Sequence, residues 1–383
     1  MFGKKIHLFT LLGFSVGIDL TWILLALLVT WSLATGLFPY YFSGMSTATY
    51  WWMGVGGAIG LFISIVFHEF CHSLVARRFG MPMKGITLFI FGGVAEMDDE
   101  PPSPDAELFM AIAGPAASIV AGFAFLGVTA LGGGLGWPEP VVGVLEYLGV
   151  INLVLAGFNL IPAFPLDGGR VLRALIWRQK KDVHLATRIA SRVGSGFGML
   201  LIFGGVFFIL RGEFIGGLWW IFIGIFIRGA SRSSLARMRM RSVLGGKPVR
   251  RFMKPDPVVV GPDVTLADLV ENYIYRYHFK MFPVVESGSL AGCVTTRDVK
   301  SIPREEWSSR SVGEVADPCS GENTVEAETD AMTALRAMQR ANTSRLMVTD
   351  SGRLVGILAL KDLLRYMSLK LDLEDGAADE LSG

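Results

Sequence analysis

Cysteine is scarce in this chain of 383 residues, which contains only Cys71, Cys293 and Cys319. Three such widely spaced residues cannot build a disulfide framework, so the soluble part of the protein is expected to face a reducing compartment. Charge is also limited, because charged residues make up 18% of the chain and the net charge is +1. Without a block of like charge or a basic stripe, the sequence predicts no nucleic-acid partner.

The first residues lack the small-residue cleavage site that ends a signal peptide. Lys4 and Lys5 precede an apolar stretch, but no such site closes a short apolar core, so no removable signal is predicted. Hydrophobic residues make up 51% of the chain. Together with the low charge, this composition is typical of a membrane protein that carries a soluble part.

Several apolar runs are long enough to cross a bilayer as helices. They are residues 20–37, 51–75, 108–131, 141–161, 194–210 and 214–227. Lys and Arg gather at the N-terminus and after the second, fourth and sixth runs, whereas the loops after the first, third and fifth contain only Arg211. By the positive-inside rule we predict a multi-pass protein of the cell membrane with both termini cytoplasmic.

The second run contains His68, Glu69 and His72 near its end. An ionisable group at bilayer depth costs about 2.5–3.5 kcal/mol on insertion scales, so such groups usually serve a function. On a helix the two histidines lie on one face and can share a tetrahedral metal ion. Glu69 lies about 100° around the helix from His68, where it can take a proton from a metal-activated water. The pattern predicts metal-assisted hydrolysis, although the same letters in a soluble helix also suit a solvated charged turn.

Two histidines leave a catalytic zinc site one protein ligand short. Asp167, in the sequence NLIPAFPLDGGR, is the best candidate for the third. Pro162 and Pro165 cannot continue a helix, and the two glycines after Asp167 let the backbone turn closely, so we expect an interrupted helix there. An ordinary turn with a solvated Asp is the alternative. Cys71 points away from His72 and is interpreted as a packing residue.

These paired motifs closely resemble the site-2 protease family of intramembrane zinc metalloproteases, over residues 13–231. The resemblance implies that both HExxH histidines and Asp167 bind one Zn²⁺ per chain, that Glu69 is the general base, and that Asn159 helps to hold the substrate. The sequences FGGVAEM and AGPAAS (residues 113–118) also look like the surroundings of the site in that family.

Residues 83–97 differ from the spans around them. The sequence ITLFIFGGVAEM is rich in β-formers and too short to cross a bilayer, so it predicts a hairpin or re-entrant strand pair beside the site. The edge of such a strand can pair with an unwound substrate. Phe91, Gly92 and Gly93 are therefore candidate substrate-binding residues, and a simple amphipathic connector is the alternative.

From residue 254 the long apolar runs stop and a soluble α/β segment begins. Strand, helix, strand, turn, strand and helix recur with a period of roughly 65 residues, which indicates an internal repeat. The two repeats, at about residues 252–305 and 312–368, look like a tandem pair of CBS motifs. Such pairs form one module that often binds adenine nucleotides.

In that family the ribose and phosphate of the nucleotide are contacted by the pattern G-h-x-[ST]-x-x-D, where h is a hydrophobic residue. The Ser or Thr of this pattern lies three positions before the Asp. Thr295 and Asp298 match it in the first repeat, whereas Ala359 replaces the hydroxyl before Asp362 in the second. The resemblance implies ATP or another adenine nucleotide at Thr295, Asp298 and Asp362, and a homodimer through the module. A purely structural dimerisation module is the alternative.

The predicted fold class is therefore a polytopic α-helical membrane protein, with six transmembrane helices and a short β-rich re-entrant segment, followed by a soluble α/β tandem CBS domain. The predicted parts are a membrane metalloprotease domain, a linker, the CBS regulatory domain and an acidic disordered tail, at residues 1–235, 236–251, 252–370 and 371–383.

The predicted function is that of an intramembrane zinc metalloendopeptidase. It would cleave a single-pass membrane protein within or near its span, under the control of the nucleotide-sensing CBS pair. A CBS-regulated channel or transporter explains the spans but not the four metal-site residues, and a catalytically inactive metal-binding scaffold is a third class. No PDZ-like insertion separates the spans, so substrate selection is expected to use the membrane core or the CBS module.

Overall fold

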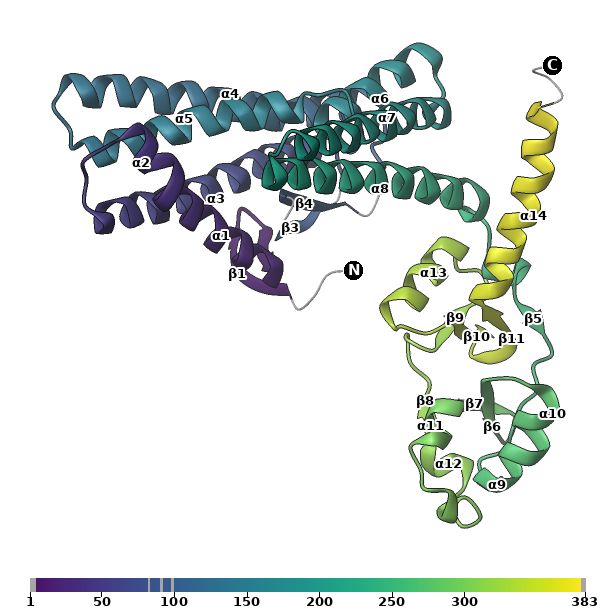
Figure 1. The fold of residues 1–383 in the computed structure, drawn as a ribbon. Coiled ribbons are helices and arrows are strands. Elements are labelled where there is room, and N and C mark those ends of the chain that lie inside the picture. The colour runs from purple at the N-terminus through teal and green to yellow at the C-terminus, as the bar shows by residue number, and fades with distance from the viewer. Residues whose placement is uncertain (1–4, 82, 90–91, 98–99, 380–383) are drawn as a thin grey trace. The chain divides into compact units, whose positions relative to one another are not determined.

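The computed structural model describes residues 5–81, 83–89, 92–97 and 100–379 (Figure 1). The chain divides into two compact units, Met1–Ala236 and Arg237–Gly383. The first contains long apolar helices and one sheet, and the second contains short helices and small sheets.

Six helical segments in the described part of the chain are long and apolar enough to span a bilayer, which confirms the six predicted transmembrane helices. The first is built from α1 (Leu20–Ser32), a π-helical turn (Leu33–Leu37) and α2 (Phe38–Tyr41). The others are α3 (Thr47–Arg78), α4 (Pro104–Gly134), α5 (Glu139–Asn159), α7 (Val183–Leu210) and α8 (Phe214–Leu244).

Local sequence explains where these helices begin and how closely they pack. Ser46 caps α3 and Ser103 caps α4, each accepting a hydrogen bond from a backbone N–H of the first turn. Gly122 of α4 and Gly149 of α5 lie face to face, and a β-carbon on Gly122 would be 3.1 Å from the Gly149 carbonyl oxygen. Small residues at such crossings let two backbones approach in a membrane.

The first unit also contains a sheet with the order β1-β2-β3-β4, and Figure 1 labels its strands β1, β3 and β4. Its strands are β1 (Lys5–Leu11), β2 (Phe14–Asp19), β3 (Met83–Phe89) and β4 (Gly92–Met97). β3 and β4 form the predicted antiparallel hairpin, and β2 pairs with β3 in parallel. The hairpin of β1 and β2 was not predicted from the sequence. Ile86 and Leu88 of β3 are buried with Val66 of α3, so the sheet packs against the helix that carries the histidines.

Helix α5 ends at Asn159 and the amphipathic helix α6 (Asp167–Lys180) begins at Asp167, which is the expected interruption. The non-helical segment between them is held by Ser231 of α8, whose hydroxyl donates to the Phe164 carbonyl. Gly168 and Gly169 make the close turn possible, because a β-carbon on either would lie 2.2 Å from a backbone atom of this segment. The chain thus presents Asp167 at the first position of a helix.

The second unit has two similar halves. In the first half, α9 (Leu266–Asp268), a π-helical turn (Leu269–Ile274) and α10 (Tyr275–Tyr277) precede β6 (Met281–Glu286), β7 (Ser289–Thr295), α11 (Thr296–Lys300), α12 (Val312–Val315) and β8 (Asp317–Pro318). In the second, β9 (Thr324–Glu326), α13 (Ala331–Arg340), β10 (Arg345–Asp350), β11 (Arg353–Ala359) and α14 (Leu360–Asp379) follow. The described strands pair as β6-β7-β8 and β5-β11-β10-β9, with β5 at Lys254–Pro255.

Two predicted boundaries differ from the structure. The predicted linker, residues 236–251, begins inside α8, and Leu244 and Val249 are buried in the core of the second repeat. The predicted disordered tail, residues 371–383, continues α14 as far as Asp379. Both segments are rich in residues with high helix propensity, and α8 ends only where Gly245 and Gly246 break the pattern.

Candidate metal centre

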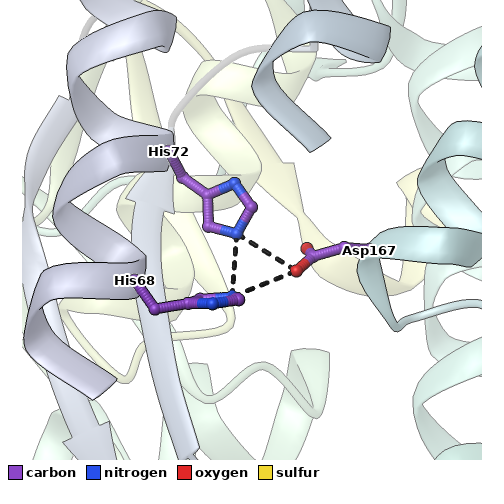
Figure 2. Close-up of side chains that lie close together, drawn as sticks. All are labelled: His68, His72 and Asp167. Carbon is purple, nitrogen blue, oxygen red and sulfur yellow. Dashed lines mark hydrogen bonds and ion pairs between the residues drawn. The ribbon is translucent and has the colours of Figure 1, made fainter. Parts of the chain in front are cut away.

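Three side chains from two helices meet in the first unit (Figure 2). His68 and His72 lie one turn apart on α3, and their Nε2 atoms are 3.1 Å from each other. The Oδ2 atom of Asp167, at the start of α6, lies 3.1 Å from each of these nitrogens. Both histidines are buried. The structure therefore brings together the two residues of the second predicted span and a carboxylate that is 95 and 99 positions away in the sequence.

Helix α4 orients both imidazoles by contacting their Nδ1 atoms, on the ring edge away from Asp167. His72 Nδ1 lies 2.6 Å from the Met110 carbonyl oxygen, and His68 Nδ1 lies 2.9 Å from the Ser118 hydroxyl oxygen. A carbonyl only accepts hydrogen bonds, so His72 Nδ1 carries a proton, and Nε2 is the ring nitrogen that faces Asp167 and can bind a metal. Outer contacts of this kind are typical of metal-binding histidines.

The triangle of Nε2, Nε2 and Oδ2 atoms fits a cation. The two Nε2 atoms and Oδ2 can each offer a lone pair, and at 3.1 Å from one another they are placed to bind one cation together. A tetrahedral zinc ion with bonds of about 2.0–2.2 Å separates its ligand atoms by about 3.3 Å. Two imidazoles and one carboxylate are also a donor set of catalytic zinc sites. Spacing, tautomer and donor types therefore agree with zinc.

Gly114 of α4 leaves room for such an ion. A β-carbon on this residue would lie 2.2 Å from His72 Nε2 and 2.6 Å from His68 Nε2, so any side chain here would press on both ligand nitrogens. Sequence reasoning had noted the AGPAAS segment but had assigned no role to Gly114, Ser118 or Met110. The only available signal was a glycine and a serine four residues apart in an apolar helix.

The other predicted residues occupy different places. Glu69 is half-buried on α3, directly after His68, and is not one of the three residues whose ligand atoms converge. The Asn159 amide donates to the Leu155 carbonyl of its own helix at 3.0 Å, so the hydrogen bonds of the described chain do not join it to the triangle. Gly92 and Gly93 pair with β3, and Phe91 lies outside the described residues.

In the CBS module, the first-repeat residues already satisfy each other. The Thr295 backbone N–H and hydroxyl both donate to Asp298 Oδ2 at 2.7 Å, forming a capping box at the start of α11. Ala359 offers no such hydroxyl in the second repeat. Asp362 Oδ1 lies 3.9 Å from Lys254 Nζ, and its Oδ2 is buried without a hydrogen-bond partner in the part of the chain that the structure describes.

Comparison with known proteins decides the family. The Peptidase family M50 model matches residues 56–141 and 134–201, and the CBS domain model matches residues 249–305 and 312–369. The zinc metalloprotease MJ0392 of Methanocaldococcus jannaschii is 32% identical over 378 residues, which cover 98% of this chain and 99% of that protein. This chain belongs to peptidase family M50.

Two further similarities of this M50 chain were found. The Mycobacterium tuberculosis protein Rip3 is 33% identical over 360 residues, covering 93% of this chain and 91% of Rip3. The solved site-2 protease from Methanocaldococcus jannaschii is 30% identical, with a TM-score of 0.42, and the match covers 61% of this chain and 95% of that one. The predicted class, an integral membrane metalloprotease with a tandem CBS domain, is confirmed.

Proposed function

We propose that this M50 protein is an intramembrane endopeptidase in which His68, His72 and Asp167 hold one Zn²⁺. The observation that carries the proposal is the convergence of the three ligand atoms at 3.1 Å, with Gly114 leaving the space between them clear. Ionisable groups buried in apolar spans are costly unless they have a function. The convergence also argues against a channel or transporter, because such a protein does not need this donor set.

Zinc, when bound, polarises the scissile carbonyl and lowers the pKa of water at the site. Glu69 is the general base, because its position beside the triangle lets its carboxylate accept the proton of the attacking water and return it to the leaving nitrogen. Met110 and Ser118 hold the imidazoles in the orientation that directs Nε2 inward. Both histidines are buried, so bulk water does not compete with their imidazoles for the metal.

The proposed substrate is a single-pass membrane protein. Its helix must unwind before cleavage, because helical carbonyls are engaged in hydrogen bonds. Strand β4 ends the order of the described sheet, so its outer edge is suited to receive the extended substrate by β-augmentation at Gly92 and Gly93. We also propose that Phe91 and Asn159 contribute to substrate binding.

The Glu69→Gln variant of the full-length protein tests the assignment. Cleavage of a single-span reporter should be abolished while the zinc content of the purified protein stays close to that of the parent, because the ligands are intact. Glu139→Gln, an exposed carboxylate at the start of α5, is the matched control and should cleave normally.

Three results would contradict different parts of the proposal. Reporter cleavage by Glu69→Gln at the parent rate would rule out Glu69 as the base. Purified parent that carries no zinc, and whose cleavage a chelator does not inhibit, would rule out the ligand set. If the parent protein carries zinc but cleaves no membrane reporter, the peptidase function is ruled out and the protein is a catalytically inactive metal-binding scaffold.

We further propose that ATP or another adenine nucleotide binds the CBS module and regulates the peptidase, and that the module forms a homodimer. Support comes from the Thr295 and Asp298 pattern and from Asp362 Oδ2, which has no hydrogen-bond partner among the described residues and can accept a ribose hydroxyl. Calorimetry on the full-length protein with ATP and AMP tests this. Binding that is weakened by Asp362→Asn but not by Asp317→Asn, an exposed Asp on β8, would support it. If neither nucleotide produces heat of binding, nucleotide regulation is ruled out and the CBS module has only a structural role in dimerisation.

A further inference from the structure

A buried ion pair joins α6, which begins with Asp167, to α4, which orients the two histidines. Arg173 of α6 donates from Nε to Glu107 Oε1 of α4 at 2.6 Å, and its second terminal nitrogen lies 2.5 Å from the same oxygen. Glu107 is fully buried and Arg173 is 7% exposed. The pair is therefore shielded from water, unlike an ordinary surface salt bridge.

The Arg173 guanidinium contacts several elements around Asp167. It lies 5.6 Å from the centre of the Phe164 ring, in the non-helical segment that leads to Asp167. Its third nitrogen lies 3.4 Å from the Thr187 hydroxyl of α7. One planar, multi-donor side chain thus ties the start of α6 to α4 and α7.

Glu107 is on the helix that orients the histidines. Met110, which accepts from His72, is one turn further along α4, and Gly114 and Ser118 follow at one-turn intervals. The ion pair therefore links the helix that sets the direction of both imidazoles to the helix that begins with Asp167.

Stability does not explain the pair. Burying two charges costs several kcal/mol of desolvation, and well-packed apolar residues are often equally or more stabilising at such positions. Glu107 Oε2 adds to the cost, because it is buried without a hydrogen-bond partner among the described residues. A fixed geometry between two helices is the benefit that an apolar pair would not provide, since apolar contacts are not directional.

We propose that Glu107 and Arg173 are positioning residues that hold the Asp167 carboxylate in register with His68 and His72. They set the affinity and the coordination geometry of the metal site without contacting the metal. The inference rests on the proposed ligand set.

The test replaces the pair by apolar residues in the full-length protein, as Glu107→Leu with Arg173→Met. The matched control is Asp105→Leu with Arg178→Met, since Asp105 and Arg178 form an exposed pair between the same two helices at 3.2 Å. Zinc affinity is measured by competition with a chromophoric chelator, coordination by the visible absorption of the Co²⁺-loaded protein, and folding by the Tm of the metal-free protein.

The buried double variant should keep the metal-free Tm of the parent, bind zinc about 10- to 100-fold more weakly and give an altered Co²⁺ spectrum, as expected for loss of an outer contact. The control should match the parent in all three. Zinc affinity and a Co²⁺ spectrum equal to those of the control would overturn the proposal. A merely structural pair would change the metal-free Tm and leave the Co²⁺ spectrum as it is.

If the double variant does not fold, Arg173→Lys decides the matter, because it retains the charge but loses the planar fork. Weaker zinc binding at an unchanged metal-free Tm supports positioning, and parent-like zinc binding overturns it. Parent protein that binds neither zinc nor Co²⁺ would instead refute the ligand set itself, so the two failures are distinguishable.

Discussion

The backbone of Gly114 lies directly against the imidazole of His72, at a place where a β-carbon would be 2.2 Å from Nε2. This close approach makes α4 one wall of the metal centre. The same helix orients the two imidazoles through Met110 and Ser118. The site therefore depends on a helix that contributes none of the three proposed ligands.

Gly114→Ala should abolish zinc binding and reporter cleavage. Its methyl group would lie 2.2 and 2.6 Å from the two Nε2 atoms, so both imidazoles would have to move out of their positions as ligands. Metal analysis and the cleavage assay measure the effect. Gly127→Ala, on the same helix with open space around its position, is the control and should behave as the parent. A Gly114→Ala variant that retains zinc and activity would show that the imidazoles keep their positions as ligands despite the methyl group.

Ser118→Ala should weaken zinc binding by about 10- to 100-fold, because His68 loses the outer contact that orients its ring. Competition with a chromophoric chelator measures the change. Thr129→Val, which removes a hydroxyl that donates to the Phe125 carbonyl of its own helix, is the control. Unchanged zinc affinity in Ser118→Ala would mean that packing alone fixes the His68 ring.

The two cysteines of the CBS module should differ in reactivity. Burial raises the pKa of Cys293 to about 12 and partial desolvation also raises the pKa of Cys319, but the Cys319 side chain is exposed to the reagent whereas Cys293 is buried. Since the thiolate is the reactive form, Cys293 stays protonated and inert when the pH rises from 7 to 9, and Cys319 reacts throughout. Mass spectrometry after maleimide treatment of the native full-length protein checks this. Equal labelling of both residues in native protein would contradict the buried environment of Cys293.

The distribution of Lys and Arg predicts that the CBS module is cytoplasmic. A membrane-impermeant maleimide added to intact cells should therefore spare Cys319 and should label Ser43→Cys, an exposed position between α2 and α3. Lysis should expose Cys319 to the reagent. Labelling of Cys319 before lysis, with protection of Ser43→Cys, would reverse the proposed orientation.

Features that depend on neighbouring residues were predictable. The lengths of the apolar runs predicted six spans, because crossing a bilayer requires only length and hydrophobicity. The spacing of His68 and His72 placed them on one helix face. The prolines and glycines around Asp167 predicted the interruption between α5 and α6, since both residue types act on the local backbone.

Local pattern was less informative where one motif serves two purposes. Thr295 and Asp298 match a nucleotide-binding pattern, yet the same spacing makes the capping box that the structure contains. Residues 371–379 have an acidic composition that indicated disorder, but their helix propensity continues α14.

Contacts between distant segments could not be inferred from the sequence. The roles of Gly114, Ser118 and Met110 behind the histidines, the pairing of Glu107 with Arg173 across 66 positions, and the parallel pairing of β2 with β3 all arise when separate elements pack. Helix periodicity and span length are properties of a continuous stretch of chain. Which side chains face one another across two helices depends on their crossing and rotation, and these are set by the packing of the whole unit.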